Sequence, residues 1–263
     1  GKESHVYMGL VRAVCCLCAR RNSLFEVAGM KILLISLSTT PVHSRHVRLL
    51  ASRLANRMHE VFVFLSSSCN VEGISDQVQV YRVAKTQRPR IELQTFNVPA
   101  LWRAIRLMWK LRPDVVHVLS PHPWNVTLLL YARAPTVVTL HDPVPHPGEG
   151  ISALVEVYNR VIIRLAKAIV LHGMAYKDYV LRQRGEAGNV FVVPLGEVEA
   201  PPIVPDAAEM RDVLMFGRIR PYKGVHIFIR AVSLLKERYP QFRFVIAGEG
   251  DLSPYKEELE KVG

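Results

Sequence analysis

Cysteine is scarce in this chain, and its arrangement excludes two common roles. Four of the 263 residues are cysteines, and three of them crowd together at Cys15, Cys16 and Cys18. That spacing fits neither a structural zinc site nor a disulfide framework. We therefore expect reduced thiols and a cytoplasmic protein.

Long apolar runs are missing as well. Charged residues such as Arg164 and Lys167 interrupt every candidate stretch, so no run of eighteen uncharged apolar residues exists. A membrane-spanning helix is therefore not expected. The sequence also lacks internal repeats and low-complexity tracts. With 49% apolar residues, it reads as a globular chain that can bury a core.

Acidic residues are too few to balance the basic ones, and the formal net charge is +11. Residues from Asp212 onward contribute only +2, so the preceding part carries +9. This excess favours an anionic partner: nucleic acid, an anionic membrane face or phosphorylated small molecules. No recognised nucleic-acid motif surrounds the basic residues, so nucleic acid binding is not expected.

Residues 1–29 differ from the rest, and we expect them to lie outside any domain. The chain begins with Gly1, whereas Met30 reads like a natural start that runs directly into a first strand. The segment Met8–Ala19 resembles a short signal-peptide core, but Arg12 and Arg20 bracket it and no small-x-small cleavage site follows, which argues against a targeting role.

Residues 30–199 alternate between strand and helix patterns, which predicts a Rossmann-like, doubly wound α/β domain. Helical stripes, such as Val47, Leu50, Leu54 and Met58, separate short β-branched runs. Those runs are 32–35, 61–65, 78–83, 115–119, 137–140, 169–171 and 190–193. Ligands of such domains sit at the carboxyl ends of the strands.

A proline-rich segment, residues 200–211, suits an interdomain linker. A second α/β unit follows over 212–263, with strands at 213–216 and 242–246 and helices at 225–238 and 254–262. So few repeats cannot cover both faces of a doubly wound sheet. We therefore expect an incomplete second domain, C-terminally truncated.

The loop Gly217–Gly224 carries the strongest chemical signal, because it joins a predicted strand to a predicted helix. Gly217 allows a tight turn, and the start of the helix offers free backbone N–H groups to an anion. Arg218 and Lys223 add two cations, enough to neutralise a diphosphate without a metal ion. Taken alone, such a pair also fits solvated loop charges.

This loop, followed one βα unit later by Ala247-Gly-Glu-Gly250, resembles the retaining GT-B glycosyltransferases, in the family-4-type branch called glycosyltransferase group 1. The resemblance implies two Rossmann-like domains with a cleft between them. It also implies that Gly217, Arg218 and Lys223 hold the donor's diphosphate. The residues that would line the nucleotide cleft are Gly248, Glu249 and Gly250.

The first domain extends the resemblance through Thr136-Val-Val-Thr-Leu-His-Asp142, where the family places a histidine near the donor sugar. His141 is thus the expected catalytic residue, although a capping or core histidine fits the pattern too. Asp142 and the proline-rich run 143–149 either shape an acceptor pocket or form a plain turn. The family's paired glycine after the first strand is absent here, which leaves Ser38 and Arg45 as acceptor-side candidates.

The resemblance implies sugar transfer from a nucleoside-diphosphate sugar to a hydroxyl acceptor with retention of configuration. A hexosyltransferase acting on a lipid-linked or polysaccharide precursor is expected, with no cofactor and no metal-ligating residues. The family's paired glutamates lie beyond Gly-Glu-Gly and are not in this chain. Two alternatives stay open: a non-hydrolysing sugar-nucleotide epimerase of the same fold, and a catalytically inactive truncated fragment.

A basic stripe, Arg103, Arg106 and Lys110, recurs at helical spacing on the helix expected around 101–111. Trp102 and Trp109 fall at its boundary with the apolar face. Such a helix can rest on anionic lipid, which would make the protein peripheral at the cytoplasmic membrane face. A solvated basic face with both tryptophans packed inward explains the same pattern.

Overall fold

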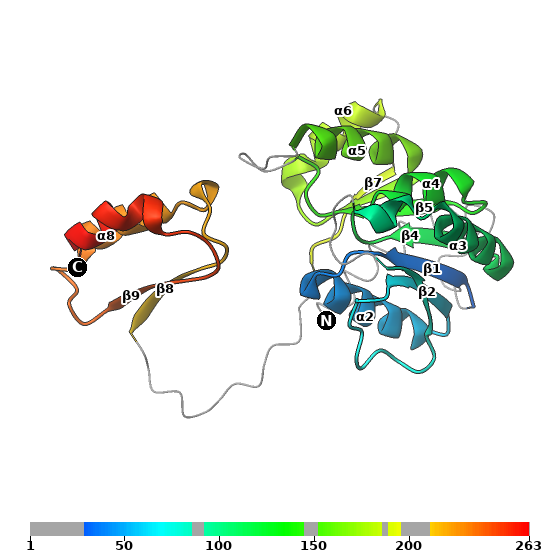
Figure 1. Cartoon of the computed structure of the whole chain (residues 1–263), viewed down its shortest axis with the longest axis horizontal. Helices are drawn as coiled ribbons and strands as arrows, with labels where there is room; N and C mark the ends of the chain where they lie inside the picture. Colours follow the sequence, from blue (N-terminus) through cyan, green and yellow to red (C-terminus); the bar gives the residue numbers. More distant parts are fainter. Residues whose placement is uncertain (1–28, 86–91, 145–151, 186–188, 196–210, 263) are drawn as a thin grey trace. The chain divides into compact units, whose positions relative to one another are not determined.

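The computed structural model describes residues 29–85, 92–144, 152–185, 189–195 and 211–262 (Figure 1). They form two compact units, one with a seven-stranded sheet and one with a two-stranded sheet. The predicted N-terminal extension and linker lie almost entirely outside the described residues, so both stay predictions.

The seven-stranded sheet is parallel throughout, with the order β3-β2-β1-β4-β5-β6-β7. Its strands are β1 (Lys31–Ser36), β2 (Glu60–Ser66), β3 (Gln79–Ala84), β4 (Val115–Val118), β5 (Thr136–Leu140), β6 (Ala168–Leu171) and β7 (Asn189–Val192). In the centre, Ile32 of β1 pairs with both Val61 and Val115. The chain therefore switches winding direction between β1 and β4, where ligands of doubly wound sheets bind.

Both faces of this sheet are covered by helices, because the strands are apolar on both sides. Leu33 and Ile35 join one buried cluster, whereas Ile32 and Leu34 join the other. Helix α2 (Pro41–Ala55) packs into the second cluster. The helices that pack into the first are α3 (Val98–Leu111), α4 (Trp124–Tyr131), α5 (Ser152–Leu165) and α6 (Lys177–Arg184). The doubly wound α/β prediction is thus confirmed for this unit.

Short 3-10 helices complete the connections: η1 (Leu93–Phe96), η2 (Met174–Tyr176), η3 (Pro221–Lys223) and η4 (Ser253–Tyr255). Among the described residues, no helix is both long and apolar enough to cross a membrane.

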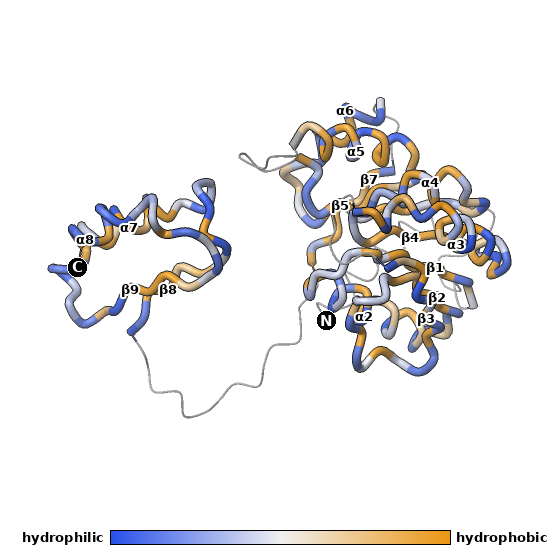
Figure 2. The backbone as a smooth tube through the Cα atoms, in the orientation of Figure 1, coloured by the Kyte–Doolittle hydropathy of each residue, from blue (hydrophilic) through white to orange (hydrophobic). Residues whose placement is uncertain are grey.

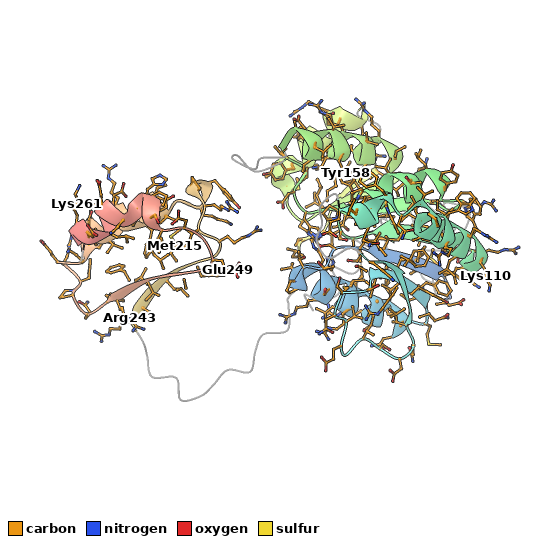
Figure 3. The ribbon with its side chains drawn as sticks, in the orientation of Figure 1. Lys110, Tyr158, Met215, Arg243, Glu249 and Lys261 are labelled. Carbon is orange, nitrogen blue, oxygen red and sulfur yellow. The ribbon has the colours of Figure 1, made fainter. Side chains whose placement is uncertain are left out.

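The second unit consists of β8 (Asp212–Phe216), α7 (Val225–Leu235), β9 (Arg243–Ala247) and α8 (Lys256–Val262). The two parallel strands are apolar (Figure 2). Met215, labelled in Figure 3, and Ile246 pack with residues of α7 and α8 on one face. The side chains of Leu214 and Phe216 on the other face are 55% and 81% exposed. Within the described part of this unit, both helices therefore cover the same face.

Candidate active site

The predicted site residues of the first unit gather at the carboxyl edge of its sheet. Ser38 follows β1 and is fully buried, and its backbone N–H donates to the Ser120 hydroxyl after β4 (3.1 Å). His141 follows β5 directly, and Asp142 is next in sequence. Arg45 lies on the first turns of α2 with an exposed side chain.

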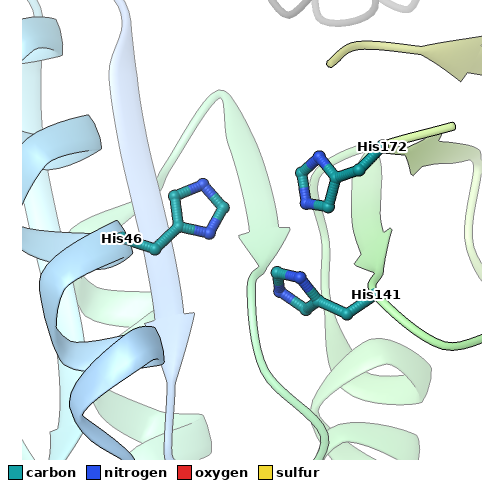
Figure 4. Close-up of side chains that lie close together, drawn as sticks. All are labelled: His46, His141 and His172. Carbon is teal, nitrogen blue, oxygen red and sulfur yellow. The ribbon is translucent and has the colours of Figure 1, made fainter. Parts of the chain in front are cut away.

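Three further histidines surround His141, and none of them was a predicted site residue. Figure 4 shows two of them, His46 and His172. His43 and His46 come from α2, and His172 follows β6. The ring of His141 lies 5.0 Å from that of His43, 5.7 Å from that of His46 and 4.8 Å from that of His172, between centroids. The strand order explains this cluster, because β5 and β6 are neighbours and α2 starts where β1 ends.

Backbone carbonyls orient two of these rings. Nε2 of His141 lies 3.0 Å from the Leu119 carbonyl oxygen, and Nδ1 of His172 lies 3.0 Å from that of Val193. A carbonyl only accepts, so these ring nitrogens carry the hydrogen. In the neutral rings, Nδ1 of His141 and Nε2 of His172 are then the acceptors.

His43 is held differently, because its Nδ1 contacts two hydroxyls. It lies 2.6 Å from the Thr40 hydroxyl and 3.0 Å from that of Ser38. This contact connects the buried Ser38 to the ring next to His141. Asp142 lies close enough to His43 to favour its charged form, while its backbone carbonyl accepts from the Asn159 amide (3.1 Å).

Burial keeps the cluster mostly uncharged. It lowers the pKa of His43 and of His46 to about 4, and repulsion from the neighbouring histidines acts in the same direction. Burial also lowers the pKa of His172. At pH 7 these three rings are therefore neutral acceptors and donors rather than cations.

In the second unit, the two predicted glycine motifs form one structure. The backbone N–H of Gly217 donates to the Ala247 carbonyl (2.9 Å), and that of Ile219 donates to the Glu249 carbonyl (2.8 Å). A Cβ on Gly248 would lie 1.8 Å from the Gly217 carbonyl oxygen. The two loops therefore touch backbone to backbone at the carboxyl ends of β8 and β9, which a side chain at Gly248 would prevent.

Arg218 and Lys223 lie on the rim of a hollow of about 120 Å³ beside these loops. Gly217, Val225 and Ile246 are among its other lining residues. Both cations are exposed, and Lys223 lies 5.3 Å from the ring centroid of Tyr222. Gly224 caps α7 with a φ of 78°, so free N–H groups of the first helical turn follow Lys223 directly.

Glu249 contributes its backbone to this arrangement, because its carbonyl accepts from Ile219. Its side chain is exposed (Figure 3). Gly250 pairs with Ile219, and a Cβ there would lie 2.7 Å from the Ile219 Cβ. The three residues of the Gly-Glu-Gly turn thus place the β9 loop against the Arg218 loop.

The basic helix predicted around 101–111 is α3, and its tryptophans are not packed inward as a pair. Trp102 is 44% exposed and forms a T-shaped contact with Trp109, at 5.6 Å between centroids. Trp109 donates from its indole N–H to the Tyr131 carbonyl (2.8 Å), and the Arg133 guanidinium lies 4.2 Å from its ring. An open hollow here is lined by Trp102, Arg106, Trp109, Lys110 and Arg112.

Solved structures of sugar-nucleotide enzymes share the fold of this chain. Anabaena Alr3699/HepE in complex with UDP-glucose matches with a TM-score of 0.55 and 18% identity, over 89% of this chain and 65% of that one. The catalytic domain of starch synthase IV from Arabidopsis thaliana, bound to ADP and acarbose, matches with a TM-score of 0.58 and 14% identity, over 89% of this chain and 71% of that one. A putative UDP-N-acetylglucosamine 2-epimerase from Listeria monocytogenes matches with a TM-score of 0.56 and 13% identity, over 89% of this chain and 66% of that one. The molecule therefore has the α/β GT-B fold, as the sequence predicted.

Comparison of the sequence with known families identifies the family of this chain. Residues 43–196 match Glycosyltransferase Family 4, and residues 200–263 match Glycosyl transferases group 1. Because the first match alone covers more than half of the chain, this protein belongs to glycosyltransferase family 4.

Curated relatives agree with that assignment. Glycogen synthase of Mycobacterium tuberculosis is 28% identical over 260 residues, which cover 84% of this chain and 62% of the relative. An uncharacterized glycosyltransferase of Bacillus subtilis, YqgM, is 22% identical over 220 residues, which cover 78% and 58%. The chain thus spans about three fifths of the length of the curated relatives it matches.

Proposed function

We propose that this chain acts in sugar transfer from a nucleoside-diphosphate sugar to a hydroxyl acceptor, with retention of the anomeric configuration. The observation that carries the proposal is the hollow of the second unit, where Arg218 and Lys223 flank a glycine turn at the start of α7. Two cations and free backbone N–H groups are a suitable receptor for a diphosphate.

Diphosphate binding here needs no divalent metal in this proposal. Arg218 offers a planar fork of donors, and Lys223 offers a compact cation on the other side of the turn. Together they stabilise the negative charge that develops on the leaving diphosphate as the sugar–phosphate bond breaks.

His141 is proposed as the catalytic residue of the first unit. In its neutral form, the bond to the Leu119 carbonyl leaves Nδ1 as an acceptor for a sugar hydroxyl. Ser38, Arg45 and Asp142 are proposed on the acceptor side, Ser38 through its contact with His43. The Pro143–Glu149 run lies largely outside the described residues, and its acceptor role stays a prediction.

The proposed reaction is a displacement on one face of the sugar. The bond from the anomeric carbon to the diphosphate oxygen breaks, and a bond to the acceptor oxygen forms on the same face. The departing diphosphate oxygen takes the proton of the acceptor hydroxyl, so no protein nucleophile is required. The site then contributes charge stabilisation and positioning.

The relatives support a hexosyl donor and a polysaccharide acceptor. A glycogen synthase is among the curated relatives, and the structural neighbours include a starch synthase and HepE, which was solved with UDP-glucose. A lipid-linked acceptor is the other candidate. The exposed tryptophan and cations of α3 support a peripheral contact with an anionic membrane surface.

A transfer assay tests the proposed function. The chain is incubated with UDP-glucose or ADP-glucose and with glucan oligosaccharides, and released nucleoside diphosphate and the anomeric configuration of the product are measured. We expect acceptor-dependent release, an α-linked product from the α-linked donor, and loss of release in Arg218→Ala. Release at the background rate would favour the alternative of a chain that is catalytically inactive by itself.

The epimerase alternative predicts a different product from the same mixture. Because an epimerase-like structure shares the fold, the fold does not decide between the two reactions. Incubation with UDP-N-acetylglucosamine alone separates them: a transferase leaves the sugar configuration unchanged, whereas an epimerised nucleotide sugar would overturn the transferase proposal.

A further inference from the structure

Three imidazoles of the first unit converge from three separate elements. His46 comes from α2, His141 follows β5 and His172 follows β6 (Figure 4). Each offers one ring nitrogen, and these three atoms all lie within 4.8 Å of one another. All three side chains are half-buried, so the cluster is neither fully solvated nor closed.

The hydrogen bonds of these rings do not use every ring nitrogen. Nε2 of His172 and Nδ1 of His46 are buried and have no hydrogen-bond partner among the described residues. Buried polar nitrogens without a partner are uncommon in folded proteins. His141 and His172 also donate their other nitrogen to a backbone carbonyl, the outer contact that fixes the ring orientation of metal-bound histidines.

We propose that His46, His141 and His172 bind one divalent transition-metal ion of the zinc, nickel or copper class. Three neutral nitrogen ligands suit these ions, whereas magnesium and calcium require oxygen ligands. Tetrahedral coordination at about 2.1 Å places ligand nitrogens about 3.4 Å apart, so the rings need to close by an ångström or so. The fourth position is left for water or a ligand oxygen.

His43 is not a member of the proposed site. Its Nδ1 is engaged by the hydroxyls of Thr40 and Ser38, although its ring lies 5.0 Å from that of His141.

This site does not depend on the proposed sugar transfer, since it can be measured without donor or acceptor. Metal binding does have a consequence for the proposed sugar transfer. A bound ion occupies the nitrogen of His141 that would otherwise accept from a sugar hydroxyl, so zinc and sugar are expected to compete at this residue.

Titration calorimetry on the full, tag-free chain tests the proposal, with zinc, nickel and magnesium chloride as probes. The thiols are first alkylated, because a cysteine thiolate is a strong zinc ligand and the chain has four cysteines. We expect one zinc or nickel ion per chain and no magnesium. His46→Asn and His172→Asn should each weaken binding by about tenfold or more.

His59→Asn is the matched control, because His59 is also half-buried in the first unit but lies before β2, outside the cluster. It should bind the metal like the unchanged chain. Cobalt(II) supplies a second measurement: a four-coordinate site gives intense visible bands that the two cluster variants lose, and thermal unfolding without metal shows whether these variants fold. Absence of binding in the unchanged chain, or equal binding after both cluster substitutions, would overturn the proposal.

Discussion

Gly248 shows why the β8 and β9 loops can approach each other only where one residue has no side chain. A Cβ at this position would meet the Gly217 carbonyl oxygen at 1.8 Å, and that oxygen belongs to a backbone that cannot rotate away cheaply. Gly248→Ala should therefore separate the β8 and β9 loops and destabilise the second unit by about 2 kcal/mol or more. Faster amide hydrogen exchange in β8 and β9 would report this loss.

Gly173→Ala is the comparison for that substitution. No atom lies within 4 Å of a Cβ at Gly173, and its φ of −148° suits any residue. Amide hydrogen exchange in β8 and β9 should stay unchanged in Gly173→Ala. Equal protection of β8 in Gly248→Ala and in the parent chain would refute the role assigned to the close approach.

We expect His122 to make the first unit sensitive to acid. It is 2% exposed, its Nδ1 accepts from the Trp124 backbone N–H (3.2 Å), and its Nε2 has no partner among the described residues. Burial lowers its pKa to about 4, while the carboxylate of Glu92 acts in the opposite direction. The Tyr158 hydroxyl, which accepts from the His122 backbone N–H (3.3 Å), is the other titratable group beside it.

Since the folded pKa lies below the unfolded value of 6.5, the unfolded chain binds the proton more readily. The contribution of His122 is therefore complete above pH 6.5 and is lost as the pH falls toward 4. His122→Gln should reduce this acid-induced loss of unfolding free energy by roughly 2–3 kcal/mol. Chemical denaturation at pH 7 and pH 4.5 measures the difference, and His226→Gln, an exposed histidine, should change nothing. An equal pH dependence in His122→Gln would contradict the assignment.

The sequence associates some of the candidate site residues with one another and not others, for a physical reason. Arg218 and Lys223 stand within one loop, so spacing along the chain is enough to associate them, and the hollow now includes both. His46, His141 and His172 are far apart in sequence, and only strand order brings them together. Their one sequence signal was position, since His141 and His172 each directly follow a buried apolar run.

At the scale of elements, α3 invites a direct test of surface charge. Arg106 and Lys110 are exposed beside the tryptophans, so the double variant Arg106→Glu/Lys110→Glu reverses the charge of the proposed contact without touching the core. Binding to vesicles containing phosphatidylglycerol should fall by about tenfold or more, because each basic residue near such a surface contributes about 1 kcal/mol. Co-sedimentation measures the bound fraction.

The control for that experiment is Arg164→Glu/Lys167→Glu, which makes the same charge change on exposed residues at the end of α5 and just after it. It should lower vesicle binding only slightly. Equal losses in both double variants would mean that net charge, rather than the α3 surface, attracts the membrane. Undiminished binding in the α3 variant would also refute the contact.

Periodicity predicted the elements unevenly. The seven strands of the first sheet were predicted because parallel strands buried on both faces read as apolar runs. Helix α4 was not predicted, because its sequence Trp-Asn-Val-Thr-Leu-Leu-Leu-Tyr is apolar on nearly every side and shows no single apolar stripe. Helix α6 was not predicted for a different reason, because most of its residues are polar and Val180 is its buried residue. Helix α7 ends at Leu235, three residues before the predicted boundary.

For the whole molecule, the strand and helix pattern predicted a doubly wound α/β fold and the family resemblance implied GT-B, whereas the order of the strands required the structure. Sequence alone does not show that β1 pairs with both β2 and β4, and this pairing creates the switch in strand order at which ligands of doubly wound sheets bind. The basic excess before Asp212 is likewise explained only in part, by the surface of α3.

Donor binding is the most direct test of the central claim, which is that Arg218 and Lys223 form a receptor for a nucleoside diphosphate. Calorimetry with UDP, UDP-glucose and ADP-glucose should show binding to the whole chain in the absence of magnesium. Arg218→Ala and Lys223→Ala should each weaken it by about tenfold or more, since each removes a charge-assisted contact. Arg230→Ala, which removes an exposed cation from α7 of the same unit, should leave binding unchanged. Binding that requires magnesium, or that survives the loss of both Arg218 and Lys223, would contradict the account.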